Sequence, residues 1–105
     1  MKPDPFRDYV LDQLAGLDAV EARAMFGGHG LYCRGAFFAI VYKGRLYFRT
    51  DDATRPAYVK RKMKPFRPKP GMTLKTYYEV PGDVQEDREV LAAWAGRAVA
   101  VAEAA

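Results

Sequence analysis

Few residues of this chain could carry out chemistry, and the first two are His29 and Cys33, its single histidine and single cysteine. On a helix, a spacing of four would bring them together as a catalytic dyad or as half of a metal site. Glycines at positions 27, 28 and 30 argue against a helix. On an extended strand, four residues span roughly 13 Å, which is too far for a hydrogen bond or a shared metal. We therefore interpret Cys33 as a small core residue.

Two further motifs also have simpler structural explanations. Asp51 and Asp52 could act as paired carboxylates or bind magnesium, but the sequence offers no further ligands, and helix capping explains them better. The run Gly27-Gly28-His29-Gly30 could be a phosphate loop, but extended residues follow it where a phosphate loop needs a helix. We interpret its glycines as a turn with special backbone angles. We thus predict no enzyme activity, no catalytic residue, no cofactor and no metal.

The elements around these residues predict an α+β domain. An amphipathic helix begins at Asp4 and closes at Gly16. Alternating residues predict strands over 20–26, 31–34, 36–42 and 45–50, followed by a short helix that starts near Asp51. The prolines at 65, 68 and 70 predict a loop, residues 73–80 a strand, and Asp83 the start of a last helix. The order is α-β-β-β-β-α-β-α, an antiparallel sheet with helices on one face in a two-layer domain over residues 1–105.

A hairpin at Lys43-Gly44 predicts which residues share a face of the sheet. If Tyr42 faces Arg45, then Val41 and Ala39 lie on the core side, and Ile40 and Phe38 on the side without helices. Aromatic residues rimmed by arginine, here including Arg34, have the composition of an interface centre. We predict a protein partner or a homodimer on this face, and the alternative is that a helix covers it. The predicted partner-binding residues are Tyr32, Phe38, Ile40, Tyr42, Arg45, Tyr47, Arg49 and Tyr77.

The positive charge of the chain is concentrated in one segment. The formal net charge is +4, but residues 53–78 contain no acidic residue, which leaves the rest of the chain net negative. Such a run attracts phosphate backbones, and weak binding of DNA or RNA, with the aromatic face stacking on bases, is the alternative function. A solvated, solubilising face explains the run equally well. The predicted polyanion-binding residues are Arg55, Lys60, Arg61, Lys62, Lys64, Arg67, Lys69 and Lys75.

The start of the chain bears on its location. Residues 1–8 lack the apolar run of a signal peptide, and the sequence has no stretch that could span a membrane. A lone cysteine cannot form an intrachain disulfide. We therefore expect a cytoplasmic protein that does not bind membranes.

An ordered set of motifs resembles the TfoX N-terminal domain family. The motifs are RAMFGGHGLY at 23–32, GRLYFRTDD at 44–52, Pro65-Phe66, YYEVP at 77–81, and a helix around Leu91 and Trp94. The resemblance runs from about Phe6 to Val101. It implies a cytoplasmic bacterial domain with an α+β fold similar to that of secretion chaperones, and no catalytic residues. The family's namesake regulates competence for DNA uptake and has a second, helical domain, so we expect this chain to be a stand-alone N-terminal domain.

Overall fold

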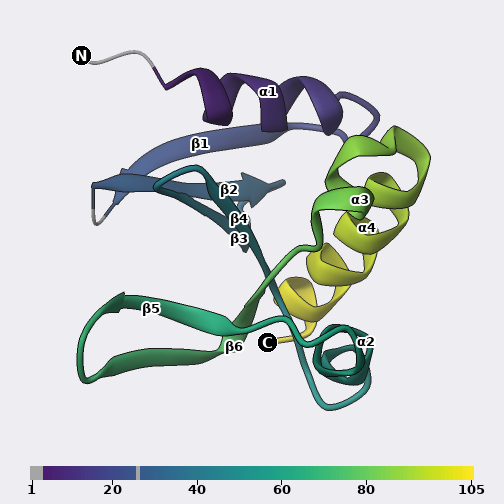
Figure 1. Cartoon of the computed structure of the whole chain (residues 1–105). Coiled ribbons are helices and arrows are strands. Elements are labelled where there is room, and N and C mark those ends of the chain that lie inside the picture. The colour runs from purple at the N-terminus through teal and green to yellow at the C-terminus, as the bar shows by residue number, and fades with distance from the viewer. Residues whose placement is uncertain (1–3, 26) are drawn as a thin grey trace.

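Over residues 4–25 and 27–105, which the computed structural model describes, the chain forms six strands and four helices (Figure 1). The helices lie on one side of a bent antiparallel sheet, so the predicted α+β class is confirmed. The elements are α1 (Pro5–Gln13), β1 (Val20–Met25), β2 (Gly28–Cys33), β3 (Ala36–Tyr42), β4 (Arg45–Arg49), α2 (Arg55–Lys60), β5 (Pro65–Lys69), β6 (Met72–Glu79), α3 (Gly82–Glu86) and α4 (Arg88–Ala104).

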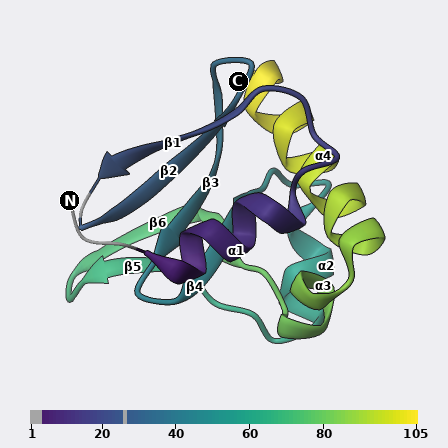
Figure 2. The same cartoon turned by 90° about the horizontal axis from the view of Figure 1, so that it is seen from above.

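The order of strands across the sheet is β1-β2-β3-β4-β6-β5, so β6 lies between β4 and the edge strand β5. The hairpin of β3 and β4 has the predicted register, with Tyr42 opposite Arg45 and Ile40 opposite Tyr47. Figure 2 shows β1 and the hairpin of β5 and β6 at opposite margins of the sheet, with α1 lying across it. The first helix begins as predicted, because the Asp4 side chain accepts a hydrogen bond from the Arg7 backbone N–H at 3.0 Å.

Residues 65–69 and the segment around Asp83 differ from the sequence prediction. Residues 65–69 form β5 where a loop was predicted, because an edge strand has no neighbour on one side and tolerates the missing N–H of Pro65 and Pro68. The last helix does not start at Asp83. The chain forms the short helix α3, becomes extended at Asp87, and starts again as α4, whose first turn is capped by the Asp87 carboxylate.

The glycine run is only partly a turn. Gly27 has a φ of +79°, as a turn requires, but Gly28 and Gly30 are residues of β2. A Cβ on Gly28 would collide with the backbone oxygen of Val41 on β3, and a Cβ on Gly30 would lie 2.7 Å from the Met25 sulfur. Gly28 is therefore needed for the close approach of β2 and β3, whereas a side chain at Gly30 would displace the flexible end of Met25 and press on the Phe37 ring.

The main core lies between the helices and the sheet. It contains apolar side chains from α1, the central strands and α4, and Val10, Leu14, Phe48, Leu91 and Ala95 are all at most 1 % exposed. A second, smaller core lies on the other face of the sheet. It is formed by Ile40, Tyr47, Phe66 and Tyr77, with Phe37, Tyr42 and Leu74 packed against them.

Phe38 is in the main core and not on the face without helices where the sequence placed it. The reason is a bulge between β2 and β3, in which Leu31 pairs with Ala39 while Tyr32 pairs with Phe37. The extra residue at the bulge is Phe38, so Phe38 and Ala39 both contact the main core, and Phe37 turns to the second core.

Candidate functional site

The predicted partner face is largely buried by the chain itself. Ile40, Tyr47 and Tyr77 are on the predicted face, but they are 1 %, 8 % and 6 % exposed. Phe66 of β5 packs on the Tyr47 and Tyr42 rings, with centroids 4.8 Å and 5.3 Å away, and the Phe37 ring packs on Tyr77 at 5.3 Å. The cover is thus the hairpin of β5 and β6, and not a helix. Burial raises the pKa of the Tyr47 and Tyr77 phenols.

Four of the predicted partner-binding residues keep part of their surface. Tyr32 and Tyr42 are half-buried at the rim of the second core, where Tyr32 stacks on Phe37 with centroids 5.0 Å apart. The Tyr42 hydroxyl donates to the Pro68 carbonyl at 3.3 Å. Arg45 is exposed and binds the Glu79 carboxylate at 3.0 Å, and Arg49 lies opposite Tyr77 on the neighbouring strand. The rim therefore combines tyrosine with arginine, as predicted, around a filled centre.

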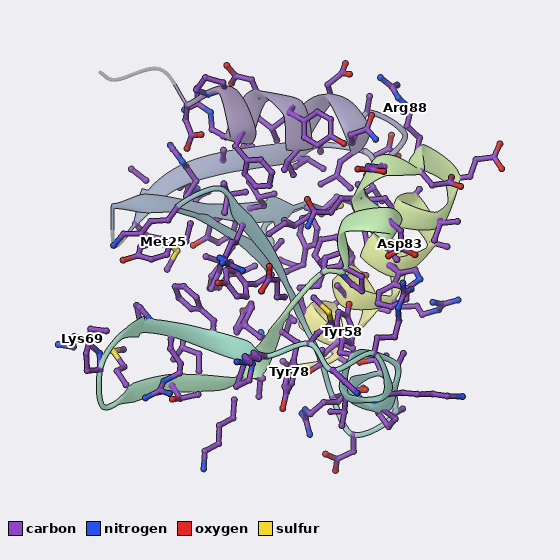
Figure 3. The ribbon with its side chains drawn as sticks, viewed as in Figure 1. Met25, Tyr58, Lys69, Tyr78, Asp83 and Arg88 are labelled. Atoms are coloured by element: carbon purple, nitrogen blue, oxygen red, sulfur yellow. The ribbon has the colours of Figure 1, made fainter. Side chains whose placement is uncertain are left out.

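The predicted polyanion-binding residues all come from one end of the molecule, on α2, β5, β6 and the segments between them. Two are engaged in ion pairs, Arg55 with Asp52 at 3.0 Å and Arg61 with Asp83 at 2.5 Å. Among the described residues, no ion pair involves the other six, which are all exposed: Lys60, Lys62, Lys64, Arg67, Lys69 and Lys75. Figure 3 shows Lys69 at the far end of the hairpin of β5 and β6.

A groove beside β5 joins the basic segment to the rim. Its volume is about 410 Å³, and it is lined by the cations Arg45, Lys62, Lys64 and Arg67, by Glu79 and by the Tyr47 ring. Glu79 is already paired with Arg45, so the groove keeps an excess of positive charge. An anionic group of a partner would meet cations here from β4, from the segment between α2 and β5, and from β5.

His29 has a structural environment that the sequence did not reveal. It lies on the helix side of β2, where its Nε2 is 3.2 Å from the Arg7 guanidinium and its Nδ1 is 3.3 Å from an Asp4 oxygen. The second contact is too poorly aligned for a hydrogen bond, which leaves Nδ1 buried without a hydrogen-bond partner among residues 4–25 and 27–105. No signal in the sequence connects these residues, because they belong to different elements.

Cys33 and the aspartate pair have structural partners as well. The buried Cys33 thiol donates to the Asp18 carbonyl at 3.1 Å. Asp51 accepts hydrogen bonds from the Ala53 and Thr54 backbone N–H groups, while the Thr54 hydroxyl accepts from the Asp51 N–H. These bonds hold the pKa of Asp51 below its ordinary value. Asp51 therefore closes the turn that leads into α2, but it does not cap the helix as predicted: the N-cap residue is Thr54, which makes no side-chain capping bond, and Asp52 pairs with Arg55.

A hollow between α2 and α4 was not predicted from the sequence. It has a volume of about 230 Å³ and is lined by Arg49, Tyr58, Trp94, Arg97 and small side chains. The Tyr58 ring meets Trp94 edge-on at 4.9 Å and lies near Tyr78, as Figure 3 shows. Burial raises the pKa of Tyr58, and Arg97 opposes this rise. Tyr58 is the buried residue of α2. From the sequence, only the basic residues of this helix are predicted to be functional, and Tyr58 is therefore missed.

The described residues contain neither a metal centre nor a membrane span. Within 4–25 and 27–105, no three histidine, cysteine or acidic side chains are placed to hold a metal ion. In the same residues, no helix is both long and apolar enough to cross a membrane.

Comparison with protein-family models gives a match over most of the chain. The family model described as the TfoX N-terminal domain matches residues 12–102, which is most of the chain. No protein of established function matches the sequence.

Proposed function

This chain belongs to the TfoX N-terminal domain family, a family of regulatory domains, and from that premise we propose that it is a non-enzymatic regulator that acts by binding protein. The observation that carries the proposal is the rim of the second core, where Tyr32, Tyr42, Arg45 and Arg49 keep exposed surface beside a rigid aromatic centre. Tyrosine and arginine on a rigid base are typical of interface hot spots. A cytoplasmic location is part of the proposal, because the single cysteine is free and buried.

The test is capture of partners from a native lysate, with and without nuclease. We expect a protein to be captured in both conditions and to be lost with Tyr32→Ala or Arg49→Ala. Tyr9→Ala is the matched control, because Tyr9 is exposed on α1, away from this rim. Capture that nuclease abolishes would contradict the proposal. Tyr47→Glu is unsuitable as a test, because it would bury a charge in the second core.

Binding to DNA or RNA is the second candidate, and the groove of Arg45, Lys62, Lys64 and Arg67 favours it. Because Tyr47 and Tyr77 are buried, this binding would rest on phosphate contacts rather than on base stacking. We expect sequence-blind, micromolar affinity that falls steeply with salt. Lys62→Ala should lower the slope of log K against log salt by about 0.9 if it loses one phosphate contact. Arg88→Ala, an exposed cation on α4, is the control.

A further inference from the structure

The two edges of the sheet differ in how well they are protected. Edge strand β5 contains Pro65 and Pro68, and its charged residues are Arg67 and Lys69, of one sign. Prolines and like charges both prevent a further strand from pairing. Edge strand β1 has the sequence VEARAM, without proline. No described element lies outside β1 in Figure 2, so this edge is open for pairing.

The backbone groups of β1 that point outward can be identified from one hydrogen bond. Arg34 N–H donates to the Ala19 carbonyl at 3.3 Å, directly beyond the pair of Val20 and Cys33 that begins the ladder. In an antiparallel ladder, hydrogen-bonded and non-bonded pairs alternate. The odd-numbered residues of β1 therefore bond to β2, and Val20, Ala22 and Ala24 direct their N–H and C=O groups away from the sheet.

The side chains of β1 are arranged symmetrically about Ala22. Val20 and Ala22 pack toward the main core, so Glu21 and Arg23 project from the opposite face. Their side chains are 67 % and 62 % exposed, and they are joined by a 3.4 Å ion pair. Arg23 also lies over the Tyr32 ring at 4.5 Å, next to the rim described above. One acid and one base thus flank a small central residue.

We propose that β1 pairs antiparallel with β1 of a second copy, about a two-fold axis through Ala22, which joins two sheets into one. Ala22 then bonds to the partner's Ala22, and Val20 to the partner's Ala24, so every outward backbone group of the strand is used. Glu21 lies opposite the partner's Arg23 in a non-hydrogen-bonded pair, where cross-strand side chains are closest. The inference rests on the proposed function, a regulator that binds protein, and adds to the rim a second contact surface, the β1 edge, whose occupant is another copy of this chain.

Charge reversal at Glu21 and at Arg23 tests this register. The mixture of the two variants serves as a control, because it can associate only if both variants are folded. By sedimentation velocity, we expect a dimer for the wild type and at least roughly tenfold weaker association for Glu21→Arg and for Arg23→Glu, which each place like charges opposite one another. Mixing the two variants should restore association as a heterodimer, although neither variant retains the intrachain ion pair. Variants that self-associate like the wild type, or a mixture that stays monomeric, would overturn the proposal.

A backbone variant provides the second test. Ala22→Pro removes an N–H that the monomer does not use, so we expect a monomer with an unchanged circular dichroism spectrum. Purified protein is used throughout, so the result is independent of capture from a lysate. A wild type that is monomeric at all concentrations but still captures a protein would refute the pairing of copies and leave the proposed function standing. A dimer that survives Ala22→Pro would place the contact elsewhere and refute the inference.

Discussion

The ring of Tyr47 packs on the ring of Phe66 with centroids 4.8 Å apart, and this contact joins the central strand β4 to the edge strand β5. Phe66 is fully buried, although it lies on an edge strand between two prolines. The hairpin of β5 and β6 is therefore part of the folded core and not a flexible basic appendage. The cations on this hairpin are accordingly held on a defined surface.

Phe66→Ala should lower the free energy of unfolding by about 3–5 kcal/mol, because it removes the ring that covers Tyr47 and Tyr42. Denaturant unfolding measures this loss. Val59→Ala is the control, since Val59 is 55 % exposed on α2 and should change stability by no more than about 0.5 kcal/mol. Equal effects of the two substitutions would show that the second core contributes little.

Gly28→Ala and Gly96→Ala should have opposite effects on stability. A methyl group on Gly28 collides with the backbone of β3, at a cost of about 1–3 kcal/mol or more. Gly96 is exposed on α4 with open space around it, so alanine there should add about 0.5–1 kcal/mol. Thermal unfolding of both variants provides the comparison. A Gly28→Ala protein as stable as the wild type would contradict the close approach of β2 and β3.

Tyr58→Phe should make the protein more resistant to alkali. Burial raises the pKa of Tyr58 in the folded protein above the unfolded value of about 10. The folded state therefore holds this proton more tightly, and the resulting stability is complete below about pH 10 and is lost as pH rises beyond it. The stability of the wild type relative to Tyr58→Phe should be constant up to about pH 10 and should fall as the pH rises above it. A difference that does not change with pH would refute the prediction.

The ion pair of Arg61 and Asp83 should weaken in acid. Arg61 donates to both Asp83 oxygens and lowers the pKa of that carboxyl below its ordinary value of about 3.9. The contribution to stability is then complete above about pH 4 and is lost as pH falls through the lowered pKa. An NMR titration of the Asp83 carboxyl measures this directly. Arg61→Gln should raise the pKa of the Asp83 carboxyl toward its ordinary value. An Asp83 pKa that is the same in Arg61→Gln and in the wild type would contradict the ion pair.

Several features could be predicted from the sequence because they depend on neighbouring residues. The cap at Asp4 and the turn at Asp51 use hydrogen bonds within three residues, and the register of β3 and β4 follows from the hairpin at Lys43-Gly44. The same register correctly placed Ala39 and Val41 in the main core. The family resemblance found in the ordered motifs is confirmed by the match over residues 12–102.

The tertiary structure alone decided which face is covered and by what. A single extra residue in β3 reverses the alternation and moves Phe38 into the main core, and no local preference reveals such a bulge. The prolines of β5 indicate a loop locally, yet Phe66 gains enough burial against Tyr47 to form an edge strand. His29 meets Asp4 and Arg7 only because the fold brings the start of α1 beside β2. In each of these contacts, residues far apart in the sequence bury each other's surface from water. The free energy that favours the contact therefore exists only in the assembled fold.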